Sequence, residues 1–292
     1  MSAETRLDRV LALAAIPELA DLHPDDLASL AEQAEEQTVS ADDACAVRLL
    51  LSGRVEAGPS RTPIAAPAMI GAVEALAGVA FPVRAVSDAW VLAIERPALL
   101  WVMSDVFETM LAMLRHTAAR WLLAEDLEAE PVTREGSAPP LDRPVSLAHR
   151  ILLLSGCEIF RSLRVHGLGR VASEMEELEL PAQSILWEPG ARASHCFAVI
   201  DGSVEIGAEP FRSAPLLQRP GAVLGLRRVI SGGERNTRAV STTPVRVLRL
   251  AGESLVDELE DDPEMAAAFL ESLAHQTLRA ESANPKQPEP RP

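Results

Sequence analysis

The chain has 292 residues, enough for two domains that each bury a hydrophobic core. With 48% hydrophobic and 24% charged residues, its composition is that of a globular protein. No apolar run of about 18 residues or more predicts a membrane span, and residues 1–20 mix charged and apolar side chains, unlike a signal peptide. The formal net charge of −16 disfavours binding to the phosphates of a nucleic acid.

The first predicted domain covers residues 5–124. Leu27, Leu30 and Ala34 lie at helical spacing and predict an amphipathic helix near its start. At its end, residues 99–123 predict one long helix with apolar side chains on more than one face. Such a helix needs burial on several sides, and two arrangements satisfy this need: cover by the rest of the same chain, or a homodimer.

Residues 125–145 contain five proline or glycine residues and predict a semi-extended linker, because proline fixes φ and removes a hydrogen-bond donor. The second predicted domain follows at residues 146–280. In it, residues 196–200 predict a strand that runs into a tight turn at Asp201-Gly202. Residues 245–250 alternate apolar and basic side chains, as a half-buried antiparallel strand does.

The second domain is expected to end in a helix over residues 265–278. Asp262 and Pro263 are its start signal, and the acidic run at residues 258–264 is interpreted as a solvated approach to it. This helix offers a second surface for a homodimer. Residues 281–292 include four prolines and predict a disordered tail.

Short matches recur in the same order in the two domains, which indicates an internal duplication. The matches are Leu22 with Leu163, Leu27 with Leu168 and Leu30 with Val171, 141 positions apart; Gly53-Arg54-Val55-Glu56 with Gly202-Ser203-Val204-Glu205, 149 apart; and Gly71 with Gly225, Arg84-Ala85-Val86-Ser87 with Arg238-Ala239-Val240-Ser241 and Val91 with Val245, 154 apart. The first gain of residues in copy two coincides with residues 181–190, which read as strand, turn and strand. Copy one has only polar residues 40–43 there, so its β-roll is expected to lack most of a hairpin.

Each copy therefore predicts a helix, antiparallel strands and further helices. This is an α+β fold with two antiparallel β-rolls of the jelly-roll type, each flanked by helices. The order of elements and the turn residues resemble the cyclic nucleotide-binding domain family, which includes catabolite activators and the paired domains of cAMP-dependent kinase regulatory subunits. In copy two the resemblance covers most of residues 159–280. It is carried by residues 181–182 and 187–190, which precede Val199-Ile200-Asp201-Gly202-Ser203-Val204.

The resemblance also locates a phosphate-binding cassette, from Leu224-Gly225-Leu226 to Glu234-Arg235-Asn236-Thr237. In the family this is a short helix whose amino end faces the cyclic phosphate, with an Arg that binds the phosphate and a Glu that accepts from the ribose hydroxyl. The candidate ligand residues are Gly225, Leu226, Arg235, Asn236 and Thr237, and the implied ligand is cAMP or cGMP. Arg235 keeps the Arg position, but Leu226 stands at the Glu position.

Copy one departs further from the family, because Ala72 stands at the Glu position and Phe81 at the Arg position. A phenyl ring cannot bind a phosphate, so copy one is not expected to be a nucleotide site. In copy two, structural alternatives stay open. Arg235 also fits a solvent-exposed loop residue, Gly225 is also explained by backbone torsion alone, and Arg227-Arg228 is typical of a solvated helix face.

The cysteines are Cys45, Cys157 and Cys196, odd in number and without zinc-site spacing, so a reducing, cytoplasmic location is expected. His195 adjoins Cys196, but neighbouring strand residues point to opposite faces and are not expected to share a metal ion. No motif typical of hydrolases, nucleotide triphosphatases, zinc proteases or dinucleotide enzymes occurs, and catalysis is not expected.

Fourteen residues follow Leu278, too few for the DNA-binding domain that activator-type family members carry there. The expected output is therefore contact with a protein partner whose identity the sequence does not give. Two hypotheses follow: a sensor that binds cAMP, cGMP or another small anion through copy two, and a regulatory scaffold that requires no cofactor. Leu226, Ala72 and Phe81 favour the scaffold.

Overall fold

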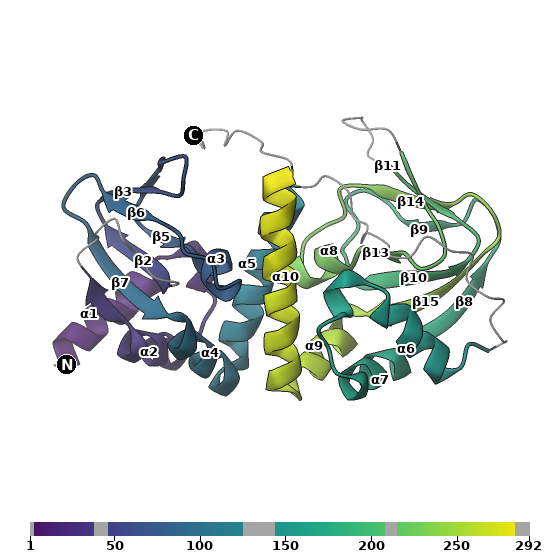
Figure 1. Ribbon diagram of the computed structural model, residues 1–292, viewed down its shortest axis with the longest axis horizontal. Helices are drawn as coiled ribbons and strands as arrows, with labels where there is room; N and C mark the ends of the chain where they lie inside the picture. Colours follow the sequence, from purple (N-terminus) through teal and green to yellow (C-terminus); the bar gives the residue numbers. More distant parts are fainter. Residues whose placement is uncertain (1–2, 38–45, 125–143, 208–214, 284–292) are drawn as a thin grey trace. The chain divides into compact units, whose positions relative to one another are not determined.

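The computed structural model describes residues 3–37, 46–124, 144–207 and 215–283 (Figure 1). The chain divides into two compact units, Met1–His116 and Thr117–Pro292, with the division inside helix α5 (Phe107–Ala124). Most of the predicted linker and the polar residues 40–43 lie outside the described residues. The predicted tail is helical over its first three residues, because the last helix continues to Ala283.

Unit 1 is an α+β β-roll in which helices precede and follow the strands. Its elements in chain order are α1 (Ala3–Ala14), η1 (Pro17–Leu19), α2 (Pro24–Gln33), β1 (Glu35–Gln37), β2 (Ala46–Ser52), β3 (Arg54–Ala57), β4 (Thr62–Ala65), β5 (Ala68–Ile70), α3 (Ala72–Leu76), β6 (Val83–Ala85), β7 (Trp90–Glu95), α4 (Arg96–Asp105) and the start of α5. The strands form two antiparallel sheets, in the orders β1-β7-β2-β5 and β4-β3-β6. The roll core lies between these sheets.

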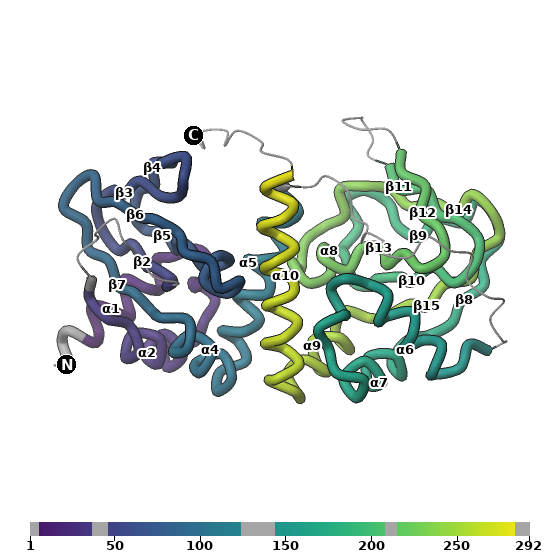
Figure 2. Tube along the Cα trace, viewed as in Figure 1, coloured from purple at the N-terminus to yellow at the C-terminus, as the bar shows by residue number. Residues whose placement is uncertain are grey.

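Unit 2 repeats this plan (Figures 1 and 2). After the end of α5, its elements are α6 (Leu147–Ser155), η2 (Glu158–Phe160), α7 (Val165–Ser173), β8 (Glu176–Leu180), β9 (Ile185–Trp187), β10 (His195–Asp201), β11 (Val204–Gly207), β12 (Leu216–Gln218), β13 (Val223–Leu224), α8 (Leu226–Ser231), β14 (Arg238–Ser241), β15 (Val245–Ala251), α9 (Gly252–Glu260) and α10 (Pro263–Ala283). Its antiparallel sheets run β8-β15-β10-β13 and β12-β11-β14-β9. Within the described residues only β9 has no counterpart in unit 1, and the predicted fold class is confirmed.

The strand registers correct one part of the predicted duplication. Val55 pairs with Ala85, and its counterpart Val204 pairs with Ser241, so β6 and β14 correspond at 156 positions rather than 154. The same two-position shift is found in the last strand of each unit. Leu50 pairs with Val91 of β7, and its counterpart Val199 pairs with Val247 of β15, which lies 156 positions after Val91. The match of residues 84–87 with residues 238–241 was therefore wrong by two positions.

The predicted single helix over residues 99–123 is also wrong. Val106 is extended, with φ −127° and ψ 97°, and divides the segment into α4 and α5, which are bent by 120°. The same junction in unit 2 lies at Asp262, immediately before α10. The Asp262 carboxylate accepts a hydrogen bond from the Met265 amide at 3.0 Å, in agreement with the predicted start of this helix at Asp262 and Pro263. Across the described residues no single helix is long and apolar enough to cross a membrane, although α4 and α5 together meet that test as a bent pair.

Each unit fixes its opening helices with one arginine that the sequence analysis did not identify. Arg9 of α1 donates to the carbonyls of Ala31 and Ala34 at the end of α2, at 3.3 and 3.0 Å. Arg150, 141 positions later, donates to the carbonyls of Ala172 and Met175, again 141 positions later. Carbonyls at the end of a helix have no partner within it, so both arginines cap a helix carboxyl end.

Candidate functional site

The cassette of unit 2 begins at Gly225, where β13 ends and α8 starts. Gly225 has φ 74°, a left-handed conformation that favours glycine. A Cβ atom at this position would also collide with the guanidinium of Arg235. The glycine is therefore required by torsion and by the close approach of one specific side chain.

Arg235 is not the exposed loop residue that one interpretation held it to be. Its side chain is buried, with the residue 3% exposed. Nη1 donates to the carbonyl of Gly225 at 3.1 Å and Nη2 donates to the carbonyl of His195. The guanidinium lies 4.3 Å from the centroid of the Trp187 ring, which stacks in turn on Phe197. Two backbone carbonyls and an aromatic face thus engage the cation within the protein.

The other candidate residues differ in burial and in their partners. Leu226, at the position of the family's carboxylate, is buried, and its apolar side chain brings no hydrogen-bond acceptor. Thr237 is buried and its hydroxyl accepts from Trp187 Nε1 at 3.3 Å, so it belongs to the support of Arg235. Asn236 is exposed. The structure therefore places Arg235 beside Gly225, and both Arg235 and Thr237 beside Trp187, whose role the sequence analysis did not foresee.

Arg227 on α8 is buried, and the prediction of a solvated helix face was wrong for it. Its guanidinium lies 3.6 Å from the centroid of the Trp121 ring, and Nη2 donates to the side-chain carbonyl of Gln276 on α10. Trp121 belongs to the part of α5 that falls in unit 2. The cassette helix is thus connected to both α10 and the end of α5, by contacts between residues that lie far apart in sequence.

His195, whose carbonyl accepts from Arg235, has an imidazole with a pKa below its ordinary value of 6.5. Burial lowers the pKa of His195, and the positive charges of Arg249 and Arg235 lower it further. Ser194 Oγ lies 2.8 Å from its Nδ1. Cys196 is buried, and no group of three or more potential metal ligands occurs in the described part of the chain.

In unit 1 the same positions carry an exchanged pair of side chains. Gly71 again has a left-handed φ, 73°, but here Phe81 packs against it where Arg235 packs against Gly225. The guanidinium comes instead from β2: Arg48, 1% exposed, donates to the carbonyl of Phe81 at 3.1 Å.

The position of Arg48 in β2 is that of a phenylalanine in unit 2. Arg48 pairs with Ile70 in unit 1, as Phe197 pairs with Leu224 in unit 2. Unit 1 thus has Arg on the strand and Phe in the cassette, and unit 2 has Phe on the strand and Arg in the cassette. At these two equivalent positions each unit therefore has one buried guanidinium and one phenyl ring, contributed from opposite positions.

Part of unit 2 is similar to a known protein family. Residues 177–262 match the family described as the cyclic nucleotide-binding domain. No curated protein sequence matches the chain. The family match spans the cassette and most strands of unit 2.

Several solved structures are similar to the chain. The N-terminal domain of a transcriptional regulator from Streptomyces coelicolor is 23% identical and covers 45% of this chain and 96% of its own, with a TM-score of 0.41. The regulatory domain of Toxoplasma gondii PKA with cAMP is 12% identical and covers 97% and 98%, with a TM-score of 0.37. A cyclic nucleotide-binding-like protein from Brucella abortus is 25% identical and covers 38% and 97%, with a TM-score of 0.34.

Proposed function

Because residues 177–262 match the cyclic nucleotide-binding domain family, we propose that this chain is a non-catalytic regulatory or scaffold protein that acts through protein contacts and binds nucleotide weakly at most. The observation that carries the proposal is the state of Arg235. Its guanidinium is engaged by the carbonyls of Gly225 and His195 and by the face of Trp187. A cyclic phosphate would have to compete with all three.

The energies favour this interpretation. A hydrogen bond to a charged group contributes about 1.5–3 kcal/mol, so moving Arg235 onto a phosphate exchanges protein contacts for ligand contacts of similar strength. Leu226 offers no acceptor to a ribose hydroxyl, which costs a further ~1–3 kcal/mol. That cost alone lowers affinity roughly five- to hundredfold.

The partner surface is the second part of the proposal. Most apolar side chains of α10 are buried within the chain, as are Met110, Met113, Leu114 and Trp121 of α5. These contacts support cover by the same chain rather than a homodimer through residues 265–278. Trp101 of α4 is exposed by 55%, so the contact surface that we propose on unit 1 is centred on this side chain.

Calorimetric titration of the full chain with cAMP and with cGMP tests the proposal. We expect no saturable heat up to about 1 mM nucleotide. Arg235→Ala is the site variant, and Arg238→Ala is its matched control, because Arg238 is an exposed neighbour whose partner is Glu188. Micromolar binding that Arg235→Ala abolishes and Arg238→Ala preserves would overturn the scaffold function.

Leu226 provides a gain-of-function arm. Leu226→Glu places a carboxylate where the family has one, whereas Leu226→Met keeps the volume without an acceptor. Nucleotide binding by the first variant alone would identify the missing acceptor as the reason for weak binding in the wild type.

A sensor is the second candidate function, and one observation favours it. Arg235 still lies beside Gly225, nine positions after Leu226, at the spacing that the family resemblance requires. A change in the orientation of this single side chain would turn the guanidinium toward a ligand. The same titration decides between the two functions.

A further inference from the structure

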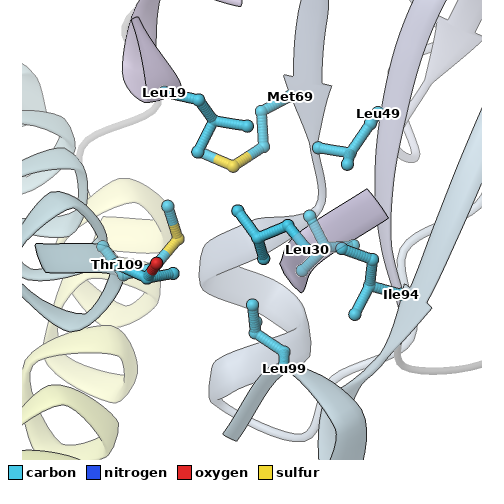
Figure 3. A pocket seen from close by; sticks show the side chains of 9 residues that line it. Leu19, Leu30, Leu49, Met69, Ile94, Leu99 and Thr109 are labelled. Atoms are coloured by element: carbon cyan, nitrogen blue, oxygen red, sulfur yellow. The ribbon is translucent and has the colours of Figure 1, made fainter. Parts of the chain in front are cut away.

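Helix α4 of unit 1 has one buried face and one exposed face. Leu99 is buried, and Figure 3 shows its side chain pointing toward Leu30 in the apolar interior of the unit. Trp101 follows Leu99 by two positions, which is about 200° around a helix, and it is exposed. Asp105 lies four positions after Trp101, so it is on the same face one turn later, and it is also exposed. The exposed face of α4 therefore carries an indole and a carboxylate on neighbouring turns.

The equivalent helix of unit 2 has a different outer face. α4 and α9 begin 156 positions apart, at Arg96 and Gly252, which is the offset found for the last strands. The outer positions are exposed in both helices and differ in character: Pro97, Trp101, Ser104 and Asp105 of unit 1 stand where unit 2 has Glu253, Asp257, Glu260 and Asp261. Carboxylates are well solvated, whereas an exposed indole leaves a large apolar surface in water. The exposed indole is thus particular to unit 1 and is not required by the fold that the two units share.

The charge of this segment favours a cationic occupant. Residues 97–114 contain two carboxylates, Asp105 and Glu108, and no Lys or Arg. Both carboxylates are exposed. Arg96, just before the segment, donates to the carbonyl of Leu76 at 3.3 Å. Because the chain as a whole has a net charge of −16, positive charge on a partner favours its association with this face.

The buried tryptophans of unit 2 show which cation suits an indole in this protein. Among the residues that the structure describes, the guanidinium of Arg227 lies 3.6 Å from the centroid of the Trp121 ring, and that of Arg235 lies 4.3 Å from the centroid of the Trp187 ring. A planar guanidinium stacks on an indole and presents parallel N–H groups to a carboxylate, whereas the ammonium of Lys is a point charge. Arginine therefore matches an indole with a carboxylate one turn away better than lysine does.

A membrane surface matches this face less well than a protein does. Helices that lie on a membrane carry Lys and Arg on their polar face, which anionic lipids attract. Residues 97–114 have neither, and the negative potential of an anionic membrane repels their carboxylates.

We propose that the exposed face of α4 docks a protein partner through an arginine, whose guanidinium stacks on Trp101 and pairs with the Asp105 carboxylate. This inference rests on the proposed function, because it names the kind of partner for the contact surface centred on Trp101. Trp and Arg are also the residues most enriched among those that dominate the binding energy of protein interfaces.

The test titrates the full chain with three short peptides and observes the peptides by NMR. Each peptide has a central residue flanked on both sides by Leu and then Ala, with blocked ends. The central residue is Arg, Lys or citrulline, which has nearly the shape of Arg without its charge. The ring current of an indole moves the δ-methylene signals of a stacked Arg upfield. We expect a saturable upfield shift with the Arg peptide and binding about threefold weaker or more with the citrulline peptide, with the Lys peptide between them.

Three variants locate the contact. Trp101→Leu keeps an apolar side chain without the ring and should abolish the upfield shift. Asp105→Asn should weaken binding of the Arg peptide about two- to fivefold, the contribution of an exposed ion pair. Asp261→Asn is the matched control, because it removes the same charge at the equivalent position of unit 2, and it should leave the affinity unchanged. No saturable shift in the wild type, equal affinities for the Arg and citrulline peptides, or an upfield shift that survives in Trp101→Leu would each overturn the proposal.

Two further measurements separate the other possible occupants of this face. Co-sedimentation with vesicles of phosphatidylcholine and phosphatidylglycerol tests a membrane, and light scattering across a range of protein concentrations tests a second copy. We expect neither vesicle binding nor self-association that depends on Trp101. Either one, if lost in Trp101→Leu, would assign the face to that occupant and overturn the arginine partner. The nucleotide titration of the cassette does not involve Trp101, so a failure of this inference and a failure of the scaffold function are distinguishable.

Discussion

The two units keep the same helix caps and differ at the cassette. Arg9 and Arg150 make equivalent hydrogen bonds at the ends of α2 and α7. At the cassette, Phe81 lies against Gly71 in one unit and Arg235 against Gly225 in the other. The hydrogen bonds of the caps are thus alike in the two units, whereas the side chains at the cassette differ.

The exchanged Arg and Phe positions sharpen this comparison. A buried guanidinium is retained in both rolls, although it comes from β2 in unit 1 and from the cassette in unit 2. In each unit it donates to a backbone carbonyl of the cassette, that of Phe81 or that of Gly225. Both guanidiniums thus donate within the cassette segment, although the two carbonyls lie at different positions in it.

A double-mutant cycle on Arg48 and Phe81 is expected to give the largest effect. Phe81→Arg adds a second buried cation next to Arg48 and should destabilise unit 1 by about 3–5 kcal/mol. Arg48→Phe should also destabilise, and the double variant should recover most of the loss because it reproduces the arrangement of unit 2. Denaturant-dependent hydrogen exchange, followed on peptides of each unit, measures the effect separately in unit 1. Additive losses in the double variant would show that the exchange is coincidental.

The helix caps come next in expected size. Arg9→Ala and Arg150→Ala each leave two carbonyls without their charged donor, with an expected loss of roughly 1.5–3 kcal/mol in the unit concerned. Arg6→Ala is the control, because Arg6 makes an ion pair with Glu32 in which both side chains are 50% exposed. Such a surface pair contributes about 0–1 kcal/mol. Hydrogen exchange of the α2 and α7 peptides should rise only in the unit that carries the cap variant.

How far the sequence predicts the fold depends on the range of the interactions involved. The start of α10 was predictable because Asp262 and Pro263 act locally. By contrast, the sequence match aligned β6 with β14 at 154 positions, whereas the strand pairing aligns them at 156. A shift by two leaves every strand residue on the same face, so the hydrophobic pattern cannot detect it. Only the pairing with β3 and β11 fixes it.

The site shows the same limit. Gly225 was predictable because its torsion is a property of one residue and its neighbours. The environment of Arg235 was not, because Trp187 and His195 reach it from other strands. Arg227 was misjudged for the same reason, since Trp121 lies more than a hundred positions away in sequence. One signal was available for the caps, because Arg9 and Arg150 share the 141-position offset of the neighbouring leucines.

A smaller effect is expected at Arg227, which has no equivalent in unit 1, where Val73 stands. Arg227→Met keeps the length of the side chain and removes its contacts with Trp121 and Gln276. We expect a loss of about 0.5–2 kcal/mol in unit 2, the range of a desolvated cation–π contact. Faster hydrogen exchange in α8 and α10 together is the readout. Faster exchange in α8 alone would mean that Arg227 does not connect the two helices.

The smallest predicted effect is a pH dependence confined to unit 2. Burial raises the pKa of Glu177, but hydrogen bonds from Arg246 and from the Val145 amide, with the charges of Arg246 and Arg150, outweigh it, and the pKa lies below its ordinary value of 4.5. A carboxyl whose folded pKa is lowered stabilises the fold above its unfolded pKa, and this contribution is lost as the pH falls through the folded value. Glu177→Gln should therefore lower the stability of unit 2 at neutral pH. The difference from wild type should shrink below about pH 4.5.

The counterpart of Glu177 in unit 1 supplies the control for this experiment. Glu36 lies 141 positions earlier, its side chain is 65% exposed, and its partner Arg9 is 4.0 Å away. An exposed ion pair of this kind contributes little, so Glu36→Gln should leave unit 1 unchanged within error across the same pH range. Urea unfolding at several pH values, with hydrogen exchange to separate the units, gives both differences. If the loss in Glu177→Gln is the same at pH 4 as at pH 7, the carboxylate does not act through its charge, and Glu177 supports the fold only by packing.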